Sequence, residues 1–116
     1  MELGGKSPCI IFDDCDLETA IPAAAMAIFT NSGQVCFAGS RLYVQEGVYD
    51  EFLKGIAEFS KGLKVGNGFD PDTMLGPLIS EIQFNQVNKY VQEGLEEGAE
   101  VIIGGDGDNS DGYFFK

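Results

Sequence analysis

Short apolar runs alternate with stretches of helical periodicity along this chain, and this alternation limits the possible folds more than any other feature. The run 9–12 lies between Pro8 and Asp13 and predicts a short buried strand. The runs 41–45 and 101–103 predict two further strands. Because the segments between them carry apolar residues at the helical period, we expect an α/β domain with a partly parallel sheet and flanking helices.

Three helices are expected. The first follows Asp16, a favoured N-cap residue, and ends at 31–33, where Asn-Ser-Gly breaks the pattern. The third begins near Ser80 and ends at Gly98, a favoured C-cap residue. The loop 104–112 is expected to contain turns only, before a terminal strand. The residues expected to face inward are Ile21, Ala24, Ala25, Ile28 and Phe29 in the first helix, Tyr49, Phe52, Leu53, Ile56 and Leu63 in the second, and Phe84, Val87, Val91 and Leu95 in the third.

The charge and the cysteine content exclude several classes of function. The 116 residues carry 19 acidic and 7 basic side chains, a net charge of −12 that argues against binding to nucleic acid or to an anionic membrane surface. No apolar run approaches the ~20 residues of a membrane span. Three cysteines without any histidine form neither a disulfide framework nor a zinc pattern. We therefore expect no metal site and a reducing, cytoplasmic location.

The best candidate for a nucleophile is Cys36. Because the chain lacks histidine, a partner base must be Glu, Asp, Lys or Tyr. Glycines on both sides of Cys36 let the backbone approach a substrate, and backbone N–H groups there favour a thiolate and a developing oxyanion. The competing interpretation is a small buried apolar residue, the usual fate of a free cysteine, and we assign that role to Cys9 and Cys15. Glu2, beside a Gly-Gly turn, is either a mobile base or an ordinary exposed glutamate.

Three other patterns have simpler explanations. Gly-Gly-Lys-Ser at 4–7 lacks the earlier glycine of a phosphate-binding loop, and Pro8 with an apolar run follows it instead of a helix. The aspartates at 106, 108 and 111 do not follow the order of a calcium loop, because Asp111 stands where that loop requires glycine. Ser80 followed by Gln83 is a capping box, which gives both residues a structural role.

Two stretches together resemble the aldehyde dehydrogenase superfamily. Met-Glu-Leu-Gly-Gly-Lys-Ser-Pro at 1–8 is similar to its glutamate signature, and Ser-Gly-Gln-Val-Cys-Phe-Ala-Gly-Ser-Arg at 32–41 to its cysteine signature. The interval between them also suits the family, and so do the segments 65–67, 76–78 and 112–114, so that the resemblance covers the whole chain. It implies that residues 1–116 are part of the cysteine-bearing catalytic domain of a longer enzyme, with the nucleotide-binding domain outside this chain. The direct entry from Met1 into the Gly-Gly turn fits the same expectation.

The resemblance implies a mechanism for the parent enzyme. Cys36 would attack a small-molecule aldehyde to form a thiohemiacetal, hydride would pass to NAD or NADP, and Glu2 would activate the water that hydrolyses the thioester. Glu2 favours this hydrolytic chemistry over transfer to coenzyme A. We expect a homo-oligomeric parent, and no dehydrogenase turnover from the chain alone. Further matching positions are Leu3, Gly4 and Gln83 at the cofactor, and Thr30, Val35 and Phe37 at the aldehyde entry.

Two alternatives come from other functional classes. A non-catalytic module that keeps these stretches as scaffold would carry an unreactive Cys36 and would not bind a nicotinamide cofactor. A stand-alone cysteine esterase or acyl-transferase would use Cys36 and Glu2 without any cofactor.

Overall fold

The computed structural model describes Met1 and residues 3–116, and Glu2 lies outside the described residues. The chain divides into two compact units, Met1–Gly62 and Leu63–Lys116. The first unit contains β1, α1, β2 and α2, joined by two short 3₁₀ turns, η1 and η2. The second contains α3, β3 and β4. Within the described part of the chain, no helix is both long and apolar enough to cross a membrane.

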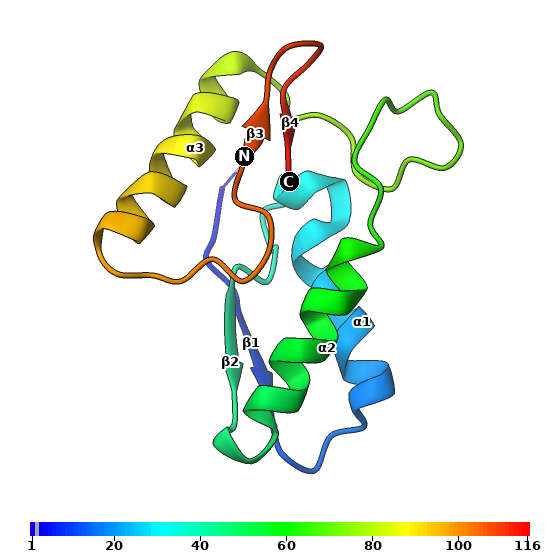
Figure 1. The fold of residues 1–116 in the computed structure, drawn as a ribbon, viewed down its shortest axis with the longest axis vertical. Helices are drawn as coiled ribbons and strands as arrows, with labels where there is room; N and C mark the ends of the chain where they lie inside the picture. Colours follow the sequence, from blue (N-terminus) through cyan, green and yellow to red (C-terminus); the bar gives the residue numbers. More distant parts are fainter. Residues whose placement is uncertain (2) are drawn as a thin grey trace. The chain divides into compact units, whose positions relative to one another are not determined.

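The first unit is built on a β-α-β motif. Strand β1 (Pro8–Ile11) pairs in parallel with β2 (Arg41–Val44), in a register that runs from Pro8 opposite Arg41 to Ile11 opposite Val44. Helix α1 (Leu17–Phe29) and the 3₁₀ turn η1 (Thr30–Gly33) form the crossover between the strands, as a parallel pair requires. The 3₁₀ turn η2 (Glu46–Val48) then leads into α2 (Tyr49–Lys61). The expected α/β class with a parallel sheet is therefore confirmed in this unit (Figure 1).

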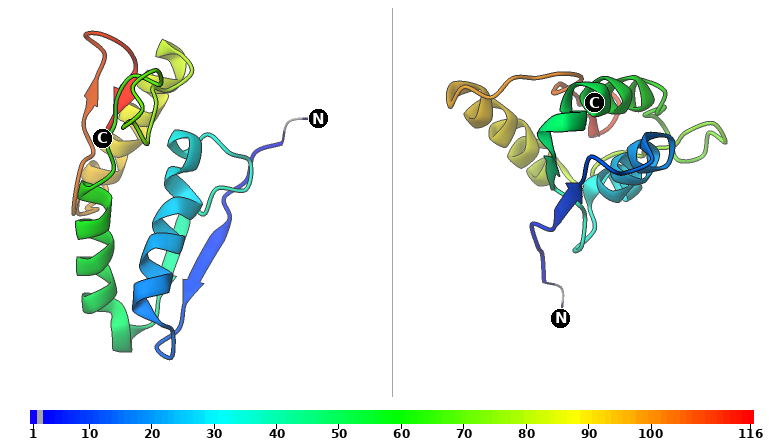
Figure 2. Two further views of the ribbon diagram at one scale, coloured as in Figure 1. Left: turned by 90° about the vertical axis from the view of Figure 1, so that its right-hand side faces the viewer. Right: turned by 90° about the horizontal axis from the view of Figure 1, so that it is seen from below.

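The core of the first unit lies where both helices meet the strand pair. Ile11 from β1, Ala24 from α1 and Phe52 from α2 are buried together, and Phe52 is 1% exposed. Figure 2 shows α1 and α2 side by side from two further directions. The helices approach closely at Gly55, where an added Cβ would overlap the side chain of Ile21. A side chain at position 55 would have to displace Ile21.

The expected burial of the run 9–12 is only half correct. Ile11 is 8% exposed, whereas Ile10 is 58% exposed and Phe12 is 62% exposed. Successive side chains of a strand point to opposite faces of the sheet, and in this unit helices cover one face only. The apolar residues on the other face are accessible to solvent.

The ends of α1 follow the sequence closely. Asp16 is the N-cap, and its carboxylate accepts hydrogen bonds from the Glu18 N–H at 3.3 Å and from the Thr19 hydroxyl at 2.6 Å. The helix ends at Phe29, before the residues that were expected to break it. The second helix was predicted too long, because Leu63 lies beyond its last residue. Tyr49, expected to face inward, is 49% exposed at its first turn.

The second unit packs α3 (Glu81–Glu96) against a short hairpin. Ser80 caps the helix, and Gly98 adopts a φ of +95° just after the C-cap residue Glu97, as expected for a glycine at this position. Phe84 is 5% exposed and lies with its ring centroid 6.3 Å from that of Tyr113 and 6.0 Å from that of Phe115. This aromatic cluster forms the core of the unit together with Leu75 and Leu78, which are also buried.

The strand assignments in the second unit need correction. The run 101–103 forms no strand, and its side chains are 38–49% exposed. The hairpin instead pairs β3 (Gly107–Asp108) with β4 (Phe114–Phe115), so that the loop 104–112 holds a strand as well as turns. Leu95, expected to face inward, is 41% exposed. A strand needs a partner for its backbone groups, and residues 101–103 find none in the described chain.

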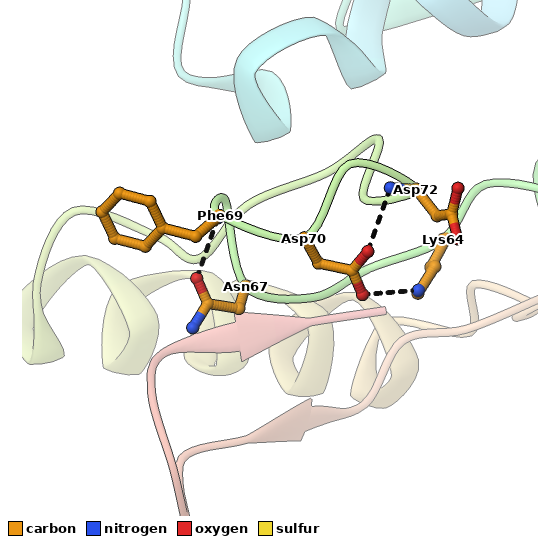
Figure 3. Close-up of polar contacts among 5 residues, drawn as sticks. All are labelled: Lys64, Asn67, Phe69, Asp70 and Asp72. Atoms are coloured by element: carbon orange, nitrogen blue, oxygen red, sulfur yellow. Dashed lines mark hydrogen bonds and ion pairs between the residues drawn. The ribbon is translucent and has the colours of Figure 1, made fainter.

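The loop after α2 is held by side-chain hydrogen bonds (Figure 3). Its ends meet where Val65 bridges to Leu75. The Asp70 carboxylate accepts from Lys64 Nζ at 2.7 Å and from the Asp72 N–H at 3.0 Å. These contacts favour the carboxylate, and they hold the pKa of Asp70 below its usual value. Phe69, at the tip of the loop, is 99% exposed.

Candidate active site

The segment before Cys36 makes a left-handed turn. Asn31, Ser32 and Gly33 lie within η1 and have φ angles of 53°, 56° and 74°. Such angles are easy for glycine and tolerable for asparagine, but they cost free energy at serine. Asn31 and Gln34 tie the turn together, because each side-chain amide donates to the other residue's carbonyl at 3.2–3.3 Å. The chain after α1 is thereby reversed sharply before it reaches the cysteine.

Cys36 lies in a tight turn and is exposed. The Ala38 N–H donates to the Val35 carbonyl at 3.0 Å, which makes Cys36 one of the two central residues of this turn. Cys9 and Cys15 are half-buried. The exposed thiol agrees with the interpretation of Cys36 as a nucleophile, and it contradicts the alternative of a small buried apolar residue.

The glycine turn that follows Glu2 lies directly against the cysteine turn. A Cβ placed on Gly5 would be 3.0 Å from the carbonyl oxygen of Cys36, so only glycine fits here without a shift of backbone. The structure therefore brings the two stretches at 1–8 and 32–41 together. Glu2, in the first of these stretches, lies outside the described residues.

Arg41, the last residue of the stretch 32–41, contacts the stretch 1–8 through two hydrogen bonds. Its Nε donates to the Lys6 carbonyl at 2.8 Å, and its backbone N–H donates to the Ser7 carbonyl at 3.2 Å. Its guanidinium also donates to the Tyr43 hydroxyl at 3.3 Å and lies over the Tyr43 ring, 5.9 Å from the centroid. Sequence reasoning did not assign a role to Arg41 or to Gly5. The sequence signal for a role of these two residues was their location within the stretches 1–8 and 32–41.

A mainly apolar hollow of about 330 Å³ opens beside the cysteine turn. Thr30, Val35 and Phe37, the three positions expected at the aldehyde entry, all line it. The Thr30 hydroxyl donates to the Met26 carbonyl at 2.6 Å and is therefore occupied by the end of α1. Phe37 is 76% exposed. The remaining residues of the lining, which the sequence did not single out, are Ser7, Pro8, Cys9, Met26, Ala27 and Gly39.

The residues expected at the cofactor fall in both units. Leu3 is 70% exposed, and a Cβ on Gly4 would meet no atom within 4 Å. This bare backbone beside an exposed apolar side chain suits contact with a flat ring. Gln83 lies in the second unit, in the first turn of α3, where its backbone N–H donates to the Ser80 hydroxyl at 3.3 Å. The structural role expected for Ser80 as an N-cap is confirmed. Among the described residues, no group of three or more His, Cys, Asp or Glu side chains is placed to hold a metal ion.

Comparison with known proteins decides the family. The sequence model of the aldehyde dehydrogenase family matches residues 1–116. The chain belongs to the aldehyde dehydrogenase family. It is 48% identical over 116 residues to an aldehyde dehydrogenase of Emericella nidulans, a match that covers 100% of this chain and 23% of that protein. It is 46% identical over 120 residues to the betaine aldehyde dehydrogenase of Bacillus subtilis, covering 100% of this chain and 24% of that protein.

Solved structures of the family share the fold. The betaine aldehyde dehydrogenase of Staphylococcus aureus in complex with NAD⁺ matches 99% of this chain and 24% of its own, with a TM-score of 0.94 at 43% identity. The lactaldehyde dehydrogenase of Escherichia coli matches 98% of this chain and 24% of its own, with a TM-score of 0.94 at 40% identity. The chain thus spans about a quarter of the length of these family members, and its fold is a part of the aldehyde dehydrogenase fold.

Proposed function

We propose that residues 1–116 form part of the catalytic domain of an NAD(P)-dependent aldehyde dehydrogenase, which oxidises a small-molecule aldehyde to a carboxylic acid. The observation that carries the proposal is the packing of Gly5 against the Cys36 carbonyl, because it joins the glutamate and cysteine signatures. The exposed thiol and the adjoining hollow support it. The nucleotide-binding domain belongs to a part of the parent enzyme outside this chain.

Cys36 performs the first covalent step. Its sulfur attacks the aldehyde carbon, a C–S bond forms, and the carbonyl electrons move to the oxygen. The backbone N–H of Cys36 is the donor in this chain that meets the developing oxyanion. Val35 and Phe37, which line the adjoining apolar hollow, are residues that we assign to the aldehyde entry. NAD(P), when bound, would supply the acceptor for the hydride that the adduct loses, and the thioester would remain on Cys36.

Glu2 performs the second step as a general base. Its carboxylate takes a proton from water, and the water oxygen attacks the thioester carbon. The C–S bond then breaks, the electron pair returns to sulfur, and the acid leaves. A carboxylate suits this role in a chain that contains no histidine.

Leu3, Gly4 and Gln83 are the residues of this chain that we assign to the cofactor. The exposed Leu3 side chain and the open space above Gly4 fit the flat face of a nicotinamide. Gln83 would contact the ribose through its side chain, since Ser80 already uses its backbone N–H. Because most of the cofactor site lies in the rest of the enzyme, the chain alone has no dehydrogenase turnover. We further propose that the parent is a cytoplasmic homo-oligomer.

The test replaces the matching segment of the Emericella nidulans relative, 48% identical, with residues 1–116. We expect the hybrid to reduce NAD⁺ or NADP⁺ when an aldehyde is supplied, and the Cys36→Ser variant to lose this activity. Cys15→Ser, which changes a half-buried cysteine outside the proposed site, is the matched control and should retain it. Glu2→Gln should keep one turnover of cofactor reduction but lose steady turnover by about a hundredfold or more.

Two outcomes would contradict the proposal. A folded hybrid whose Cys36→Ser variant still oxidises aldehyde would exclude Cys36 as the nucleophile. If the chain alone hydrolyses esters rapidly and the hybrid never reduces NAD⁺ or NADP⁺, the cofactor-independent esterase would be favoured instead.

A further inference from the structure

Three consecutive residues, 5–7, are fixed against the cysteine segment at separate points. Gly5 contacts the Cys36 carbonyl so closely that a Cβ would lie 3.0 Å from its oxygen. The Lys6 carbonyl accepts from Arg41 Nε at 2.8 Å, and the Ser7 carbonyl accepts from the Arg41 backbone N–H at 3.2 Å. The segment that follows Glu2 is thus tied both to the turn that holds the nucleophile and to the strand after that turn.

Of these contacts, the one from Arg41 Nε depends on a side chain and is charge-assisted. Hydrogen bonds from an ionised donor are about twice as strong as neutral ones. The Tyr43 hydroxyl and ring hold the far end of the guanidinium, at 3.3 Å and 5.9 Å respectively. The side chain is therefore anchored at both ends of its polar group, and it is oriented by the strand on which it lies.

We infer that Arg41 and Gly5 are positioning residues, which set the distance between the base-bearing segment and the nucleophile. This inference rests on the function proposed above. Arg41 acts through the Lys6 backbone and contacts no reacting atom. Gly5 acts by leaving room for the Cys36 carbonyl. We call this set of contacts, made by residues 5–7 with Cys36 and Arg41, the signature clamp.

The signature clamp matters most for hydrolysis of the thioester. That step requires the carboxylate of Glu2, a water molecule and the acyl carbon on Cys36 to be aligned at the same time. A displacement of about 1 Å in such a site can reduce the rate by up to about a hundredfold. Glu2 is three residues before Gly5 in the sequence, so the fixed positions of residues 5–7 limit where a base at position 2 can act.

The test uses this chain without a cofactor. Excess p-nitrophenyl acetate acetylates the exposed Cys36: sulfur attacks the ester carbonyl, a thioester forms, and p-nitrophenolate leaves. After removal of the reagent, mass spectrometry follows the loss of the acetyl group to water at each cysteine. Acetyl loss from the half-buried Cys15 is the reference within the same molecule.

Two variants of Arg41 separate the hydrogen bond from the bulk of the side chain. Arg41→Gln keeps an N–H donor at the place of Nε, whereas Arg41→Met puts a methyl group there. We expect Arg41→Met to slow acetyl loss from Cys36 by about tenfold and Arg41→Gln to recover most of the rate. Lys54→Met, which removes an exposed cation from α2, should behave as wild type. Equal rates in all four proteins, or an equal loss in both Arg41 variants, would overturn the inference.

A separate measurement distinguishes failure of the signature clamp from failure of the proposed function. If the Glu2→Gln variant loses the acetyl group of Cys36 as fast as the wild type does, Glu2 is not the base. The proposed function is then wrong at that residue. The signature clamp is then judged by alkylation of Cys36 relative to Cys15. Gly5→Ala, checked for folding by circular dichroism, should change this ratio severalfold because its Cβ displaces the Cys36 carbonyl. An unchanged ratio in folded Gly5→Ala would overturn the inference.

Discussion

At the scale of single residues, two phenylalanines show how strongly position decides the contribution of a side chain to stability. Phe52 is 1% exposed at the centre of the first unit, between α1 and β1. Phe69 is 99% exposed at the tip of the loop in Figure 3. The same side chain therefore contributes to the core at one position and contacts water at the other.

We expect Phe52→Ala to lower the free energy of unfolding by about 3–5 kcal/mol, because it removes buried apolar surface and leaves a cavity. Phe69→Ala is the matched control, and its effect should stay within about 0.5 kcal/mol. Urea unfolding followed by circular dichroism measures both. A comparable loss of stability in the two variants would contradict the assignment of the core.

At the scale of elements, the helices obtain their boundaries from local contacts. The Asp16 carboxylate satisfies the Glu18 N–H of α1, which would otherwise lack a partner at the start of the helix. The Ser80 hydroxyl does the same for Gln83 in α3. Each contact joins residues two or three positions apart, which is why both caps could be predicted from the sequence.

Asp16→Ala should destabilise the first unit by about 0.5–2 kcal/mol through loss of the N-cap. Asp14→Ala removes an equal charge from the exposed turn before α1 and serves as the control. Thermal unfolding compares the two. Equal melting temperatures would show that the cap does not contribute.

The stability of the loop after α2 should depend on pH. The Lys64 side chain, and then the Asp72 N–H, favour ionised Asp70 and lower its pKa in the folded chain. The resulting stabilisation is complete above the unfolded value of about 3.9 and is lost as the pH falls through the lower folded value. Lys64→Met should therefore raise the pKa of Asp70 toward its ordinary value, as measured by NMR titration of the carboxyl carbon.

Asp108 provides the internal control for that titration. Its pKa is also lowered, but by hydrogen bonds from Ser110. Lys64→Met should leave its titration unchanged. If Asp70 titrates at the same pH with and without Lys64, the lysine is not the cause of its lowered pKa.

At the scale of the whole molecule, much apolar surface is accessible. The face of the strand pair that the helices leave open carries Ile10, Phe12 and Tyr43, which are 52–62% exposed. The parallel pair has only two strands, and both have a free edge within the described chain. Exposed apolar faces and free edges favour association with another chain.

We therefore expect the isolated chain to form dimers or larger species, measured by light scattering across a dilution series. Ile10→Lys, which places a charge on the open face, should increase the monomer fraction. Lys54 lies on an exposed part of α2, and Lys54→Ile should not reduce the self-association. A monodisperse wild-type monomer at all concentrations would contradict this expectation.

The sequence by itself determined the presence of the three helices, the caps of α1 and α3, the α/β class with a parallel sheet, and the family. Helical periodicity and capping depend on neighbours along the chain, and the two signatures are contiguous motifs, so all of them can be recognised without coordinates. Cys36, Thr30, Val35 and Phe37 were selected in this way, and the structure places the last three around one hollow. The role of Glu2 stays a prediction, since it lies outside the described residues.

Only the tertiary structure decided which segments meet. Nothing in the sequence indicates that Gly5 packs against the Cys36 carbonyl or that Arg41 donates to the Lys6 carbonyl, because both contacts join residues more than thirty positions apart. The same reason explains the error at 101–103, where an apolar run suited a strand but had no partner to pair with. Strand pairing and burial depend on distant parts of the chain, and they become visible only after the fold has brought those parts together.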